Sequence, residues 1–95
     1  MLVQGTHMAV DVKRAVVLAR GYLSDMLQLP KEQLLLEEVE LSDDQQFWLI
    51  TFSYPAPEGS SLSVMLGGSR AYKIVKLNSD TGEFVSVKIR TLSAA

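Results

Sequence analysis

The chain has 95 residues, 47% of them hydrophobic, a net charge of −2 and no cysteine, which suits one domain around a single core. The missing cysteines exclude disulfides, thiolate catalysis and zinc–thiolate sites, and the slightly acidic balance argues against nucleic-acid binding, which needs clustered lysine and arginine. No apolar run approaches the roughly 20 residues that span a bilayer, so we expect no membrane association.

Residues 1–8 resemble a cloning or tag remnant, because His7-Met8 is the pair that a cloning site built around a start codon encodes. Met8 would then be the native start of a single domain at 9–95. Without a signal-peptide pattern we expect a cytoplasmic protein, whereas an excised fragment would leave the compartment open. A genuine, disordered amino terminus is the alternative. His7 is the only histidine, so the native chain would lack an imidazole for acid–base work or metal binding.

The clearest element is a helix at residues 11–29. Asp11 is a suitable N-cap and Pro30 cannot continue the helix. Gly21 costs about 1 kcal/mol relative to alanine, and we interpret it as a point of close contact with a strand. An amphipathic membrane helix is the alternative, but Asp25 and the lack of a basic polar face favour core packing. Apolar residues recur at three- and four-residue spacing: Val12, Ala15, Val16, Ala19, Tyr22, Leu23, Met26 and Leu27.

Residues 34–41 predict a strand with one dry and one wet face, because apolar and acidic residues alternate toward its end. Glu37 interrupts the alternation, which indicates a bulge or a later start. Glu38 and Glu40, with an aspartate of the following turn, are a hypothetical weak divalent-ion site. We favour a solvated strand edge, whose charges discourage aggregation. The acidic set is Glu37, Glu38, Glu40, Asp43 and Asp44.

Residues 46–54 predict a longer strand, which Pro55 and Pro57 should end. We expect its larger side chains beneath the helix: Trp48, Ile50, Phe52 and Tyr54. Residues 55–69 are too many for an ordinary hairpin loop, so they form a flap or include a short strand at 62–66. Gly67-Gly68 lacks the Gly-Lys-Ser pattern of a phosphate-binding loop.

Residues 70–92 predict a hairpin whose turn runs from Asn78 to Glu83, with Gly82 where a positive φ is needed. If Asn78 pairs with Glu83, alternation divides the hairpin into two faces. We expect the buried face to carry Tyr72, Ile74, Lys76, Val85, Val87 and Ile89. The opposite face would carry Lys73, Val75, Leu77, Phe84, Ser86 and Lys88.

These elements predict an α+β fold, in which one N-terminal helix packs on an antiparallel sheet of four strands, or five if 62–66 adds one. The helix with Ala15 and Ala19, the strand pair at 39–41 and 47–50, and the run at 72–85 with its Asp-Thr-Gly-Glu turn resemble the PepSY-like group of small domains. More loosely, they resemble the cystatin-like arrangement of a sheet wrapped around one helix. Members are mostly non-catalytic, often inhibitory or regulatory modules beside peptidases. The resemblance therefore implies a binding role and transfers no functional residue.

The sheet face turned away from the helix is the candidate binding surface. Its predicted members are Phe47, Leu49, Val75, Leu77 and Phe84, flanked by Lys73, Lys88 and Arg90. A lone monomer rarely exposes so many apolar side chains together. We therefore predict a non-catalytic regulatory, inhibitory or immunity-type module that binds a protein partner or a second copy. Alternatively, residues 55–69 fold over this face.

Two other functions stay open. A small-ligand binder would hold its ligand between helix and sheet near Tyr22, Trp48 and Tyr54, although core packing is the commoner use of such rings. An enzyme would depend on carboxylates, lysines or hydroxyl groups, and no spacing selects a set among them. We expect no cofactor and no metal.

Overall fold

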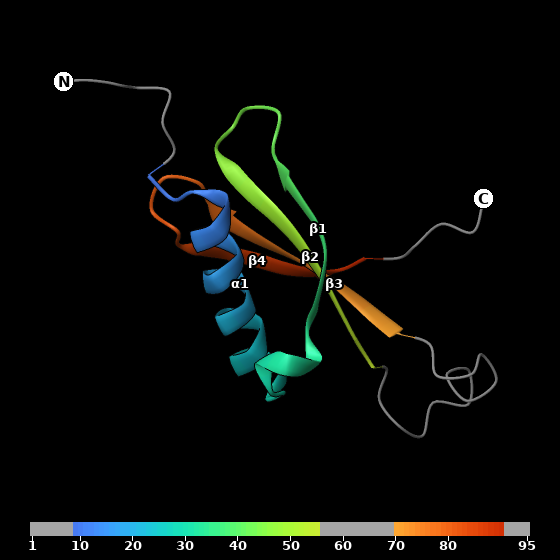
Figure 1. Ribbon diagram of the computed structural model, residues 1–95. Coiled ribbons are helices and arrows are strands. Elements are labelled where there is room, and N and C mark those ends of the chain that lie inside the picture. Colours follow the sequence, from blue (N-terminus) through green and yellow to red (C-terminus); the bar gives the residue numbers. More distant parts are fainter. Residues whose placement is uncertain (1–8, 56–69, 91–95) are drawn as a thin grey trace, which may run out of the picture.

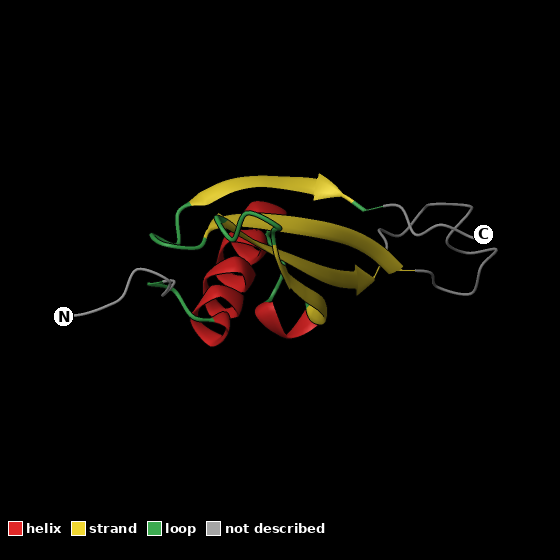
Figure 2. Cartoon of the chain, turned by 90° about the horizontal axis from the view of Figure 1, so that it is seen from above, coloured by secondary structure: helices red, strands yellow, loops and turns green. Residues whose placement is uncertain are grey.

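The computed structural model describes residues 9–55 and 70–90. The strands form one antiparallel sheet in the order β1-β2-β3-β4, and both helical elements lie on one of its faces (Figures 1 and 2). The predicted α+β architecture is therefore confirmed. The elements are α1 (Val12–Leu27), η1 (Lys31–Gln33), β1 (Leu35–Leu41), β2 (Phe47–Pro55), β3 (Arg70–Asn78) and β4 (Phe84–Ile89).

Some predictions fall on other parts of the chain. Three of them concern segments outside the described residues: the tag remnant at 1–8, the extra strand at 62–66 and the Gly67-Gly68 pair. Within residues 9–55 and 70–90, neither helix has the length and apolar character needed to cross a bilayer.

Helix α1 begins at the predicted cap, since Asp11 Oδ1 accepts a hydrogen bond from the Arg14 N–H at 2.8 Å. It ends at Leu27, slightly earlier than predicted. Gln28 adopts a left-handed conformation with φ of 55°, and its N–H donates to the Ser24 carbonyl. The helix is thus closed by a left-handed turn before the proline that follows.

The core lies between α1 and the sheet. The small side chains of Ala15 and Ala19 let the helix approach the strands closely, and the Trp48 Nε1–H donates to the Val10 carbonyl at 2.9 Å. Full burial of each large apolar side chain contributes roughly 1.5–3 kcal/mol. The buried row predicted for β2 is confirmed. The core comprises Val10, Ala15, Ala19, Leu23, Leu34, Trp48, Ile50, Phe52, Tyr54, Val75 and Leu77.

The turn between β3 and β4 has the predicted form. The Asn78 N–H donates to the Glu83 carbonyl at 2.8 Å, and the Gly82 N–H donates back to the Asn78 carbonyl at 2.9 Å. Gly82 has a φ of 80°, a conformation that glycine adopts without steric cost. The pairing of Asn78 with Glu83 is therefore confirmed.

A bulge in β4 changes the pairing beyond this turn. Leu77 pairs with Phe84 as predicted, but Lys76 pairs with Ser86, so Val85 is an extra residue in β4. An extra residue reverses the faces of every position that follows. Val87 and Ile89 consequently lie on the helix side, as predicted. The prediction that Val85 and Ile89 are buried is wrong, because they are 45% and 73% exposed.

The faces of β3 are the reverse of the prediction. Val75 and Leu77 have no exposed surface and lie in register with the buried row of β2. Both rows of β3 are rich in apolar residues, so alternation does not distinguish them. Pairing with β2, where only one row is strongly apolar, decides the faces. The row on the outer face is Tyr72, Ile74 and Lys76.

Two glycines differ in what surrounds them. A Cβ atom at Gly82 would lie 2.8 Å from Leu18 Cδ1 and 3.3 Å from Val10 Cγ2, whereas a Cβ atom at Gly21 would meet nothing within 4 Å. The prediction of a close helix–strand contact at Gly21 is therefore wrong. The close approach occurs at Gly82, where the hairpin turn reaches α1.

Candidate interaction surface

The predicted partner-binding residues are divided between the two faces of the sheet. Val75 and Leu77 are core residues, and Phe84 packs against Tyr22 of α1 with 5.6 Å between ring centroids. The outer face keeps Phe47, Leu49, Lys88 and Arg90, while the helix side holds Lys73, Val75, Leu77 and Phe84. The predicted placement of Val75, Leu77 and Phe84 on the outer face is therefore wrong. The apolar side chains that β3 contributes to that face are Tyr72 and Ile74 instead.

The middle of the outer face is polar. Thr51 is only 3% exposed, and its Oγ1 accepts a hydrogen bond from Arg90 Nη1 at 3.1 Å. The same Arg90 nitrogen donates to Glu38 Oε1, which links the two edge strands across the face. Nearby, the Lys76 ammonium lies 4.2 Å from the ring centroid of Phe47, a cation–π contact that covers part of that ring.

A second polar link crosses the outer face at Ser53, which has no exposed surface. The Ser53 hydroxyl donates to Glu37 Oε2 at 2.5 Å and accepts from Arg70 Nε at 2.9 Å. Glu37 is the bulge residue of β1, as its interruption of the alternation predicted. Together with the Arg90 link, this contact places charged side chains at two points on the outer face.

The acidic residues of β1 and its turn serve separate contacts. Asp44 Oδ1 accepts from the Ser42 hydroxyl at 2.6 Å and from the Gln46 N–H at 3.0 Å. These hydrogen bonds, the hydroxyl first, hold the pKa of Asp44 below its ordinary value. Nowhere in residues 9–55 and 70–90 do three His, Cys, Asp or Glu side chains gather closely enough for a metal ion. The cluster required by the divalent-ion hypothesis does not form there.

The rings named for a small-ligand pocket belong to the core. Trp48 and Tyr54 are each 8% exposed, and burial raises the pKa of Tyr54. The Tyr22 hydroxyl donates to the Gly82 carbonyl at 3.4 Å. The place predicted for a ligand is therefore occupied by packed side chains.

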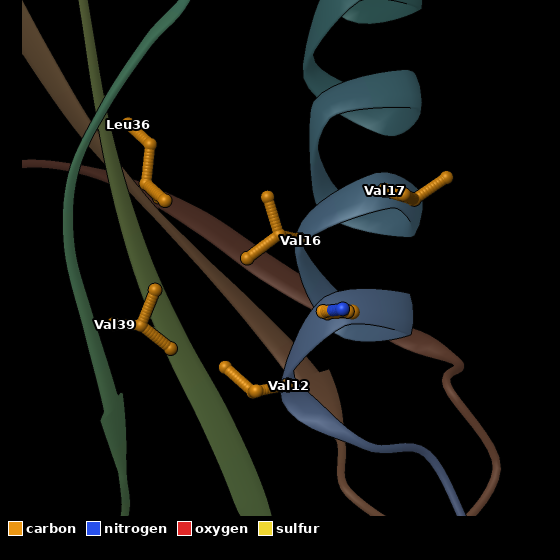
Figure 3. A pocket seen from close by; sticks show the side chains of 6 residues that line it. Val12, Val16, Val17, Leu36 and Val39 are labelled. Atoms are coloured by element: carbon orange, nitrogen blue, oxygen red, sulfur yellow. The ribbon is translucent and has the colours of Figure 1, made fainter.

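An apolar groove lies instead between α1 and β1, with a volume of about 450 Å³. In Figure 3, Val12 and Val16 point across the gap toward the side chains of β1, and Val17 points away from it. Val12 and Leu36 are 45% and 43% exposed, so solvent reaches both walls. The lining consists of Val12, Lys13, Val16, Val17, Leu36 and Val39. We call this set the α1/β1 groove.

The position of the helix explains the groove. Helix α1 packs mainly on β2, β3 and β4, and Tyr22 holds it against the hairpin. Strand β1 is the edge strand beyond the helix and has β2 as its neighbour in the sheet. Its apolar row therefore has the helix on one side only, and the groove opens along the strand edge.

Comparison with known proteins gives no match: no family model, no curated protein and no solved structure matches this chain. The PepSY-like resemblance stays a prediction.

Proposed function

We propose that this chain is a non-catalytic protein-interaction module that binds an extended segment of polypeptide at the α1/β1 groove. The single observation that supports it most is an apolar groove, open to solvent, beside an edge strand. An added strand forms main-chain hydrogen bonds with such an edge, and its alternate side chains enter the neighbouring groove. The outer face proposed from the sequence is a weaker candidate, because charged links cross its centre.

The two faces of β1 define the side chains that such a segment needs. On the helix side, Leu36 and Val39 favour apolar partners. On the outer side, Glu38 and Glu40 favour basic partners, because opposite charges on neighbouring strands contribute roughly 0.2–1 kcal/mol per pair. The preferred ligand is thus an extended segment in which apolar and basic residues alternate.

A capped synthetic peptide of alternating valine and lysine tests this proposal. Titration into ¹⁵N-labelled protein should give saturable binding, and a peptide of alternating valine and glutamate should bind at least several-fold more weakly. Val12→Gln should weaken binding about fivefold, since it removes roughly 1 kcal/mol of apolar contact.

Met26→Gln is the matched control, because Met26 is 49% exposed on the same helix and does not line the groove. Its affinity for the peptide should equal that of the unchanged protein. Equal binding of the two peptides, or equal effects of the two substitutions, would contradict the proposal.

A small apolar molecule is the second candidate occupant, because the groove volume of about 450 Å³ lies within the range of roughly 300–1,000 Å³ typical of ligand sites. Lys13 is the one charged side chain among the described lining residues, so a fatty carboxylate suits it best. This function would be favoured if octanoate changed the amide chemical shifts of α1 and β1 and the valine–lysine peptide had no effect on them.

A further inference from the structure

We infer that the extended segment is strand β4 of a second copy of this chain. The inference rests on the proposed function and names its partner. β4 is the other edge of the sheet, and Ile89 at its end is 73% exposed, the largest exposure among the large hydrophobic residues described. This strand has the alternation that the groove requires: Val87 and Ile89 lie on the helix side, and Ser86 and Lys88 lie on the outer side.

The two edges carry opposite charge on the same face. Glu38 and Glu40 lie on the outer side of β1, and Lys88 lies on the outer side of β4. Arg90, the residue after β4, also reaches the outer face, where it donates to Thr51. Arg90 already reaches Glu38 within one copy, which shows that these charges attract across the face. Glu40 and Lys88 are both exposed, so they are the best placed pair for contact between copies.

One antiparallel register satisfies both faces at once. With the first residue from one copy and the second from the other, it pairs Val39 with Ile89, Leu41 with Val87 and Glu40 with Lys88. Glu38 and Arg90 lie opposite each other in this register but keep the contact that they make within each copy. Apolar pairs then lie on the helix side and opposite charges lie on the outer side. A shift of one residue would place Ile89 among the glutamates, so this register is strongly preferred.

Like edges pair poorly by comparison. Two copies joined through β1 would bring their glutamates together, and two joined through β4 would bring their cations together, which is destabilising for directly opposed residues. Pairing of β1 with β4 leaves one edge of each kind unused in every dimer. A head-to-tail contact of this kind continues to add copies instead of stopping at two.

Sedimentation equilibrium of the full chain at low salt tests the inference. The weight-average mass should rise with concentration beyond that of a dimer. Glu40→Lys and Lys88→Glu should each weaken association about tenfold, because each places like charges opposite one another. An equimolar mixture of the two variants should recover association, as should both substitutions in one chain. Lys31→Glu, which makes the same change of charge as Lys88→Glu in η1, should have little effect.

Three results would overturn the inference: a chain that stays monomeric up to about 1 mM, an assembly that stops at two copies, or single variants that the mixture does not rescue. If the valine–lysine peptide still binds in those cases, the proposed function stands and only the second copy is wrong as partner. If neither peptide nor second copy binds, both proposals fail.

Discussion

The two sides of helix α1 differ in how completely they are covered. Toward the hairpin, Leu18 lies against Gly82 and Tyr22 packs on Phe84. Toward β1, the helix and the strand enclose the open groove instead (Figure 3). A helix is about 10–12 Å wide and strands lie about 4.8 Å apart, so one helix covers two or three strands. A fourth strand must remain partly bare, and the hairpin contacts determine that it is β1.

The largest expected effect tests the covered side. Gly82→Ala should lower the free energy of unfolding by about 2 kcal/mol, because alanine disfavours a positive φ and its Cβ would press on Leu18. Urea denaturation measures the change. A neutral substitution would show that the turn and helix are not in close contact.

A matched pair compares the two sides directly. Phe84 and Leu36 are 37% and 43% exposed, but only Phe84 packs on an aromatic ring of the helix. Phe84→Ala should lower the free energy of unfolding by about 2 kcal/mol and Leu36→Ala by about 1 kcal/mol. Thermal or urea unfolding of both variants checks the order. A reversed order would mean that β1, not the hairpin, anchors α1.

Gly21→Ala tests the solvent side of helix α1. A Cβ atom there meets nothing within 4 Å, so the substitution should raise the free energy of unfolding by about 1 kcal/mol through helix propensity. Urea denaturation is again the measurement. Destabilisation would reveal a contact on this surface of α1.

The smallest effect concerns the turn that joins β1 to β2. The pKa of Asp44 is below its ordinary value, so its contribution to stability is present above that value and is lost as pH falls through the lowered pKa. Carboxyl-carbon NMR titration should show the low pKa, and Ser42→Ala should move it back toward the ordinary value. An unchanged pKa in this variant would exclude the Ser42 hydroxyl as the main cause.

Local signals were sufficient for much of the fold. The Asp11 cap, the buried row of β2 and the Gly82 turn each depend on neighbours in sequence, and each was predicted correctly. The faces of β3 were predicted wrongly, because Val75 and Ile74 are equally acceptable as core residues. Only pairing with β2 determines which of the two faces the helix. The bulge at Val85 has no comparable signal in the sequence.

The candidate surface was less predictable than the fold. Phe47 and Leu49 were correctly placed on the outer face, but the arginine links beside them depend on contacts between distant strands. The groove depends on the offset of α1 toward the hairpin, which a single sequence does not show. Its one visible sign is that the predicted apolar stripe on α1 includes Val12 and Val16 and is therefore wider than the buried row of Ala15, Ala19 and Leu23.

The most direct test of the central claim, that the β1 side of the helix is the docking side, is an amide chemical-shift map with the valine–lysine peptide. We predict the largest shifts in residues 36–41 and in Val12 and Lys13, with the hairpin turn at Gly82 unchanged. Shifts confined to the outer-face residues of β2 and β3, or to the hairpin, would contradict it.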